Sequence, residues 1–173
     1  MKEEHKKSYV FFKGILGPIF KLYYNPKIIG AENIPKEGSF LVCGNHLHVM
    51  DQCSIMISTK RMIHYMAKKE YFDGKHAWFF KACGCISVNR QIHDEEAKNH
   101  ALNLLKQGYA VGLFPEGTRN KTKEKLLPFK YGAVPMASKT DSYIVPFGIS
   151  GDYVFRSKNL TIRIGQPFKV TNM

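Results

Sequence analysis

Several patterns that would place a protein in a function class at once are missing from this sequence. It has no G-x-x-x-x-G-K-[ST] loop for nucleotide phosphates and no G-x-S-x-G turn that would present a nucleophilic serine. Its four cysteines form no C-x-x-C pair, and its start lacks the cleavage pattern of a signal peptide. We therefore expect free thiols in a reducing cytoplasm rather than a disulfide framework.

Acidic residues are also scarce. The 173 residues include 14 Asp and Glu against 26 Lys and Arg, which gives a formal net charge of +12. A field of this sign attracts anions, so the candidate partners are nucleic acid, an anionic membrane and phosphorylated small molecules. No recognisable nucleic-acid-binding motif is present, and the aromatic residues are not interleaved with basic ones. A nucleic-acid-binding module therefore remains only as an alternative, and we expect no nucleic acid partner.

The chain has no apolar run of the roughly 20 residues that a membrane-spanning helix requires. Its most apolar segment, residues 8–24, is interrupted by Lys13 and Lys21 and contains Pro18. The spacing of its apolar residues predicts an amphipathic helix that lies in the membrane interface. A helix that covers the protein's own core is the alternative. The residues expected to contact lipid are Phe12, Ile15, Leu16, Ile19, Phe20 and Tyr23.

The rest of the sequence predicts an α/β fold. Short apolar runs typical of buried strands occupy 40–42, 62–67, 85–88, 110–114, 143–150 and 160–165. Helices are predicted between them, at 54–58, 76–84, 94–107 and 130–140. Strands that alternate with helices indicate a single domain with a mixed, mostly parallel central sheet flanked by helices. Residues 29–173 would form this domain, and residues 1–28 would form the membrane-associating segment.

Two histidines, an asparagine and an aspartate crowd the segment CGNHLHVMDQCS, residues 43–54. His46 and Asp51 would lie about 140° apart on a regular helix, too far round to touch. Gly44 and Asn45 directly follow a predicted strand, however, so we expect His46 in the turn before the helix, within reach of Asp51. A carboxylate there fixes the tautomer of the imidazole and stabilises its protonated form, which suits a general base. A plain helix start with solvated histidines is the alternative.

The H-x-H opening of this segment also invites a metal interpretation, because some dinuclear metallohydrolases begin their metal site in this way. Here Asp51 follows the second histidine by three positions rather than two, and Gln52 stands where a further histidine would be expected. Ligand-like spacing is lacking among the later histidines, which are His64, His76, His93 and His100. A metallohydrolase therefore remains an alternative, and we expect no metal.

Two further polar clusters follow predicted strands. The first is SVNR at 87–90, and the second is the turn LFPEGTRNKTK at 113–123. Open α/β sheets bind ligands at the carboxyl ends of their strands, and guanidinium groups there hold phosphate through bidentate hydrogen bonds. One basic turn is usually just solvated, but three polar clusters after three strands favour a site for a phosphorylated ligand.

Taken together, these residues resemble the glycerolipid acyltransferases, the family that includes 1-acylglycerol-3-phosphate acyltransferase. The family's N-H-x-x-x-x-D block is matched by Asn45, His46 and Asp51, and its F-P-E-G-T-R block is matched by residues 114–119. His48 is an additional histidine inside the first block. Further blocks of the family are matched by ISVNR at 86–90, PFKYGA at 128–133 and IVPFGI at 144–149.

The resemblance implies a reaction and a role for each residue. His46, oriented by Asp51, would deprotonate the sn-2 hydroxyl of lysophosphatidic acid for attack on the thioester of acyl-CoA or acyl carrier protein. Arg90 and Arg119 would bind the phosphate, while Glu116 would contact a glycerol hydroxyl or brace an arginine. The remaining substrate-binding candidates are Gly117, Thr118 and Lys130.

The same resemblance sets expectations for cofactors, acceptors and location. A thioester is already activated, so no metal or redox cofactor would be needed. Another lysolipid or glycerol 3-phosphate is the alternative acceptor, because the phosphate-binding blocks are shared across the family. With the apolar N-terminal segment and the positive charge, it implies a peripheral or monotopic enzyme of phospholipid biosynthesis at the cytoplasmic face of the cell membrane.

Overall fold

The computed structural model describes residues 2–170, with side chains from residue 7 onward. The helices are α1 (Lys2–Tyr24), the 3₁₀ helix η1 (Ala31–Asn33), α2 (Asp51–Met56), α3 (Glu70–Asp73), α4 (Ala77–Ala82), α5 (Glu95–Lys106) and α6 (Ala133–Thr140). The strands are β1 (Lys27–Ile29), β2 (Phe40–Gly44), β3 (Ile63–Lys68), β4 (Ile86–Val88), β5 (Ala110–Leu113), β6 (Tyr143–Ser150), β7 (Thr161–Ile164) and β8 (Phe168–Lys169).

The strands form one eight-stranded sheet in the order β1-β7-β6-β2-β5-β3-β4, with β8 paired to β6. The pairs β6–β7 and β6–β8 are antiparallel, and the other five pairs are parallel. The predicted α/β fold with a mixed, mostly parallel sheet is therefore confirmed. Because β2, β5, β3 and β4 run in the same direction, the turns that follow them open at one edge of the sheet.

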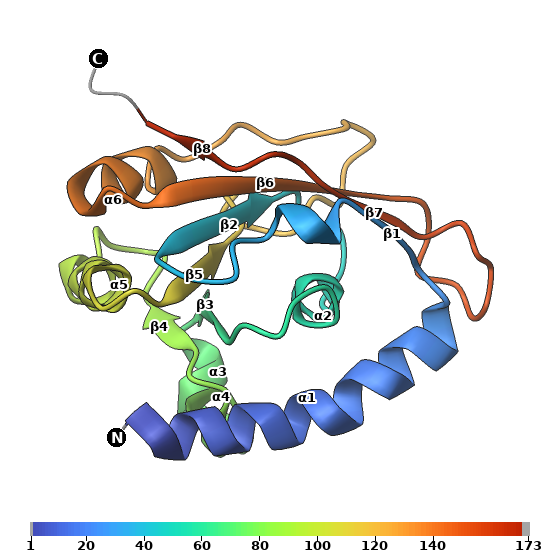
Figure 1. The fold of residues 1–173 in the computed structure, drawn as a ribbon, viewed down its shortest axis with the longest axis horizontal. Helices are drawn as coiled ribbons and strands as arrows, with labels where there is room; N and C mark the ends of the chain where they lie inside the picture. The colour runs from blue at the N-terminus through green and yellow to red at the C-terminus, as the bar shows by residue number, and fades with distance from the viewer. Residues whose placement is uncertain (1, 171–173) are drawn as a thin grey trace.

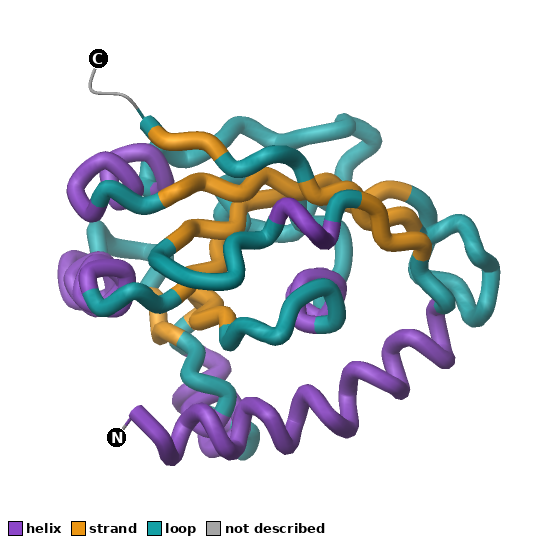
Figure 2. The backbone as a smooth tube through the Cα atoms, viewed as in Figure 1, coloured by secondary structure: helices purple, strands orange, loops and turns teal. Residues whose placement is uncertain are grey.

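Helices cover both faces of the sheet, as Figures 1 and 2 show. Along β2, Phe40 and Val42 point into a core shared with α1 and α2. Their neighbours Leu41 and Cys43 point into a second core shared with α5 and α6. Successive side chains of a strand face opposite sides of a sheet, so a strand covered on both sides reads as a continuous apolar run.

The structure corrects several predicted boundaries. Helix α2 begins at Asp51 rather than at residue 54, and α6 begins at Ala133, after a loop through the first part of the predicted segment. The short elements β1, α3 and β8 were not predicted. β1 is only three residues long and pairs with residues 161–163 of β7. Because this partner is far away in the sequence, local sequence patterns do not predict the strand.

Helix α1 packs on the domain, which corrects half of the predicted lipid-facing stripe. Phe20 is only 1% exposed and lies in the core, and Leu16 packs against that core. Phe12 contacts Phe79 of α4, with ring centroids 5.0 Å apart. These three residues follow one another at intervals of four, so they share the face of the helix that is turned toward the domain.

The other three predicted lipid contacts, Ile15, Ile19 and Tyr23, are 45%, 56% and 47% exposed. The predicted boundary at residue 28 falls within β1, and α1 shares one hydrophobic core with the sheet. Across the described residues, the helices are all too short or too polar to traverse a bilayer. The helix therefore has an inner face in the core, as the core-covering interpretation predicts. It also has an outer face that is apolar and exposed, as the interfacial interpretation requires.

Candidate active site

Three turns meet where the parallel strands end. His46 follows β2, Arg90 follows β4, and the turn at 114–119 follows β5. The structure therefore brings together the three polar clusters that the sequence places after three strands. The site lies on the side of the sheet covered by α1 and α2, because His46 and residues of both helices line one cavity.

His46 and Asp51 are in direct contact. His46 Nδ1 lies 2.7 Å from Asp51 Oδ2, and the aspartate is completely buried. The backbone N–H groups of Leu47 and His48 donate to the same oxygen, at 2.6 Å and 2.8 Å. The expectation that His46 lies in a turn within reach of Asp51 is confirmed. With Nδ1–H directed at the carboxylate, Nε2 is the proton-accepting nitrogen of the neutral ring.

Glu116 holds the backbone of the His46 turn through both of its carboxylate oxygens. Its Oε1 accepts the N–H of His46 at 2.8 Å, and its Oε2 accepts the N–H of Leu127 at 2.9 Å. The N–H of Asn120 also donates to the carbonyl of His46, at 2.6 Å. Glu116 is only 3% exposed, and its partners in the structure are these two backbone N–H groups rather than the predicted glycerol hydroxyl or arginine.

Asn45 ties the same turn to β6. Its side-chain amide donates to the carbonyl of Ile149 at 2.8 Å, and its side-chain oxygen accepts the N–H of Ile149 at 2.7 Å. A residue that satisfies both backbone groups of a neighbouring strand fixes its own backbone in turn. Asn45 therefore fixes the backbone position of His46, the next residue of the motif.

Two aromatic residues of the site escaped the sequence analysis. The ring of Phe114 stacks on the ring of His46, with centroids 4.0 Å apart and planes 12° apart. The hydroxyl of Tyr153 donates to Asp51 Oδ1 at 2.5 Å. Phe114 stands inside the F-P-E-G-T-R block and could have been suspected, but Tyr153 is 102 residues from Asp51 and belongs to none of the matched blocks.

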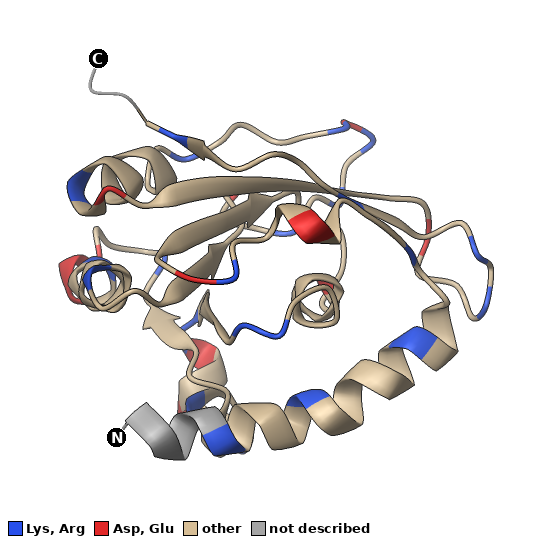
Figure 3. Cartoon of the chain, viewed as in Figure 1, with Lys and Arg blue, Asp and Glu red and all other residues tan. Residues whose placement is uncertain are grey.

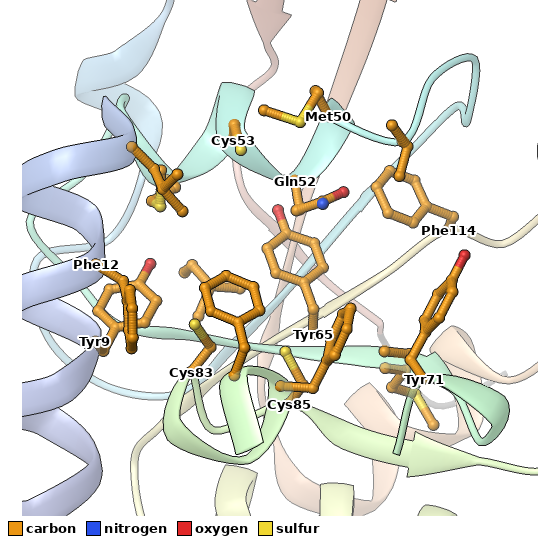
Figure 4. Close-up of a pocket in the computed structure, with 18 of the residues that line it drawn as sticks. Tyr9, Phe12, Met50, Gln52, Cys53, Tyr65, Tyr71, Cys83, Cys85 and Phe114 are labelled. Atoms are coloured by element: carbon orange, nitrogen blue, oxygen red, sulfur yellow. The ribbon is translucent and has the colours of Figure 1, made fainter. Parts of the chain in front are cut away.

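A cavity of about 340 Å³ opens beside His46. Figure 4 shows aromatic and sulfur-containing side chains around it, including Tyr9 and Phe12 from α1 and Tyr65 from β3. Arg90 and Arg119 line the same cavity, and both are exposed to solvent. The arrangement joins an apolar chamber, an imidazole and two cationic side chains.

The other predicted binding residues lie elsewhere around this edge. A second cavity of about 500 Å³ is lined by Gly117, Lys130 and, again, Arg90. Gly117 has a φ of +69°, and a Cβ placed there would come within 2.8 Å of the Lys130 side chain. Thr118 is exposed and lines neither cavity. Four of the predicted binding residues therefore line a cavity: Arg119 the first, Gly117 and Lys130 the second, and Arg90 both.

The described histidines, His46 to His100, do not gather into a metal site. Within the described part of the chain, no three His, Cys, Asp or Glu side chains come close enough together to hold a metal ion. His93 pairs with Glu95 at 2.7 Å on the surface, and His64 Nδ1 lies 2.7 Å from the carbonyl of Gly84.

With this geometry established, comparison with known proteins defines the class. The chain belongs to the acyltransferase family, whose model, described as Acyltransferase, matches residues 25–150. It is 32% identical to the 1-acyl-sn-glycerol-3-phosphate acyltransferase of Bacillus subtilis, over 92% of this chain and 81% of that protein. The Borreliella burgdorferi protein of the same name is 30% identical over 80% of this chain, which spans only 56% of that relative.

A solved structure agrees with this assignment. The crystal structure of the 1-acyl-sn-glycerophosphate (LPA) acyltransferase PlsC from Thermotoga maritima is similar, with a TM-score of 0.74 and 25% sequence identity. The similarity covers 95% of this chain and 68% of the Thermotoga protein. The resemblance inferred from the motifs is thereby confirmed at the level of family and fold.

The role of Glu116 can be tested through stability. Glu116→Ala removes both acceptors from two backbone N–H groups in a buried turn, and we expect the free energy of unfolding to fall by about 3 kcal/mol. Denaturant unfolding measures this change. Thr118→Ala, in the same turn but exposed, should change it by less than about 0.5 kcal/mol. A Glu116→Ala protein as stable as the wild type would show that the carboxylate does not brace the turn.

Proposed function

We propose that the protein transfers a fatty acyl group from an acyl thioester to the sn-2 hydroxyl of 1-acylglycerol 3-phosphate, which yields phosphatidic acid. The observation that carries the proposal is the buried Asp51 paired with His46 beside an apolar cavity that Arg90 and Arg119 also line. Relatives named 1-acyl-sn-glycerol-3-phosphate acyltransferase support the choice of acceptor. Another lysolipid or glycerol 3-phosphate is the alternative acceptor.

His46 would act as the general base. Its Nε2 would take the proton from the sn-2 hydroxyl as that oxygen attacks the carbonyl carbon of the thioester. The C–S bond then breaks, and the departing thiolate takes the proton from the imidazolium. Asp51 stabilises the positive ring in between, because a buried carboxylate 2.7 Å from Nδ1 is poorly screened by water. A base of this kind typically contributes about 10²–10⁴-fold to the rate.

The two arginines would hold the phosphate, and the cavity would hold an acyl chain. Guanidinium groups bind phosphate oxygens in pairs, and both arginines are at the solvent-exposed side of the site. The chamber offers mainly aliphatic, aromatic and thioether surface to a chain. Each methylene that leaves water for such surroundings contributes about 0.8 kcal/mol to binding.

Direct transfer between the two substrates fits the state of the thiols. Cys53, Cys83 and Cys85 line the cavity, but burial raises their pKa values to about 12, 11 and 12. They are therefore neutral thiols near pH 7, and only a thiolate is a competent nucleophile. The donor would be acyl-CoA or acyl carrier protein as a co-substrate, with no further cofactor.

The outer face of α1 would rest on the cytoplasmic surface of the membrane. Its exposed apolar residues are Val10, Phe11, Ile15, Ile19, Leu22 and Tyr23. Phe155, in the loop after β6, extends this face, because its ring lies 4.9 Å from that of Tyr23. Lys21 and Arg156 are exposed on α1 and on the loop after β6, and they would pair with lipid phosphates. Figure 3 shows basic positions along α1 and in this loop.

Helix α1 also lies between the proposed lipid surface and the cavity. Tyr9, Phe12 and Leu16 on its inner face line the cavity. Lysophosphatidic acid is itself a membrane lipid, so a site behind an interfacial helix would receive it over a short path.

The first test is the base. We expect His46→Ala to lower acyl transfer by about 10³-fold, because no other group would take the hydroxyl proton. The assay combines purified protein with a labelled acyl-CoA or acyl carrier protein and a panel of lysolipids. The rate of labelling gives the loss of activity, and mass spectrometry of the products identifies the acceptor. His48→Ala, the neighbouring histidine that lines neither cavity, should keep at least a tenth of the activity. A His46→Ala enzyme with more than a few per cent of wild-type activity would place the base elsewhere.

The second test is the phosphate site. Arg119→Ala should raise the KM for lysophosphatidic acid about 10- to 100-fold, the effect of losing one charge-assisted hydrogen bond, with a smaller effect on kcat. Lys121→Ala removes an equal charge two positions away and should leave KM within about twofold, since an exposed charge is screened by salt. An unchanged KM for Arg119→Ala would remove this residue from the phosphate site.

The third test is the membrane surface. Ile15→Ser with Ile19→Ser should weaken binding to phosphatidylcholine–phosphatidylglycerol vesicles at least about tenfold, because two apolar side chains would no longer leave water. Vesicle flotation measures the binding. Thermal unfolding should be nearly unchanged, since both side chains are exposed. Val134→Ser, an exposed apolar residue of α6, is the control for the opposite side of the sheet. Equal binding by the double variant and this control would contradict the assignment.

A further inference from the structure

The carboxylate of Asp51 receives hydrogen bonds on both oxygens. Oδ2 accepts from the His46 ring and from the N–H groups of Leu47 and His48. Oδ1 accepts from the hydroxyl of Tyr153, at 2.5 Å. Three of these four donors come from the turn before α2, and one comes from the loop between β6 and β7. The phenol is thus the one donor among them that a distant part of the chain supplies.

We propose that Tyr153 is a positioning residue for acyl transfer, acting on His46 through Asp51. The proposal rests on the proposed function, in which His46 is the base. By holding Oδ1, the phenol fixes the plane of the carboxylate so that Oδ2 stays directed at His46 Nδ1. It also shares the negative charge of the carboxylate, and so sets how strongly Asp51 attracts the proton of the imidazolium.

The phenol is held in place from several directions. Its ring stacks on that of His48, with centroids 4.3 Å apart and planes 23° apart, and it meets the ring of Tyr24 edge-on at 5.2 Å. The loop that carries it is tied to the end of α1, because the N–H of Arg156 donates to the carbonyl of Tyr23 at 2.8 Å. A donor fixed before the reaction begins does not need to reorganise when charge develops on the imidazole.

The phenol can act only as a donor at this position. Burial, followed by the nearby charge of Asp51, raises the pKa of Tyr153 far above its ordinary value. The hydroxyl therefore keeps its proton over the whole range in which the enzyme would work. An ionised carboxylate has acceptor capacity on both oxygens, so the pair is chemically matched.

Other titratable or charged groups around the pair come from several elements. They are His48 in the same turn, Cys53 on α2, Tyr65 on β3, and Arg90, Glu116 and Arg119 after β4 and β5. Replacing Tyr153 by phenylalanine alters none of these groups and keeps the ring that packs on His48 and Tyr24. A change in the pH dependence of the variant would therefore report the lost hydroxyl.

Tyr153→Phe is the decisive variant, and Tyr24→Phe is its matched control. Tyr24→Phe also removes a hydroxyl and keeps a ring, in the same aromatic cluster, without a contact to Asp51. For Tyr153→Phe we expect kcat to fall about 10- to 100-fold, as loss of one charge-assisted hydrogen bond predicts. The KM for lysophosphatidic acid should stay within about twofold, because the phenol does not line the cavity.

The pH profile distinguishes positioning from simple structural support. Without the phenol, the carboxylate concentrates more charge toward His46, which then holds a proton more tightly. The acid limb of the kcat profile should therefore move to higher pH in Tyr153→Phe and stay in place in Tyr24→Phe. The protonation of the His46 ring, followed by NMR against pH without any substrate, should move in the same direction.

The two failures can be told apart. If the wild type transfers no acyl group, the proposed function is wrong, and the NMR titration still tests the link between Tyr153 and His46. If the wild type is active but a folded Tyr153→Phe keeps kcat within twofold, with both pH curves unmoved, the inference about Tyr153 is overturned and the proposed function stands.

Discussion

The site depends on one buried negative charge. The carboxylate of Asp51 is removed from water and is stable there only because four donors surround it. Three of them come from the turn that carries His46, so this turn folds around the carboxylate. An aspartate at this position therefore determines where the imidazole lies and which nitrogen carries its proton. The reaction proposed here uses the same contact, because an ion pair must form in that place when His46 takes up a proton.

The F-P-E-G-T-R turn supports His46 and also lines the cavity. Its glutamate binds the backbone of His46, its phenylalanine stacks on the imidazole, and its arginine lines the cavity. One short segment therefore holds His46 from two sides and also places a cation at the cavity. Helix α1 combines two roles in a similar way. Its inner residues close the cavity and its outer residues remain exposed, so the apolar stripe belongs to two different surfaces.

Much of the site could be predicted because the relevant signals are local. A strand that ends in Gly44 places His46 in a turn, and the spacing to Asp51 then allows contact. The three clusters meet because parallel strands end at the same edge of a sheet. What could not be predicted depends on partners from distant segments. Glu116 was expected to contact a glycerol hydroxyl or brace an arginine, whereas its partners in the structure are backbone groups of residues 46 and 127. Tyr153 carried no signal, since a lone tyrosine in a loop gives no indication of its target.

The amino-acid sequence by itself determined the fold class, the contact between His46 and Asp51 and the cationic character of the site. Residue type, periodicity and motif spacing are properties of neighbouring positions in the sequence, so they do not depend on which distant segments pack together. Only the tertiary structure decided which face of α1 is buried, which carboxylate braces a turn and which phenol reaches Asp51. These outcomes are set by three-dimensional packing, in which groups more than a hundred residues apart in the chain meet as buried hydrogen-bonding partners.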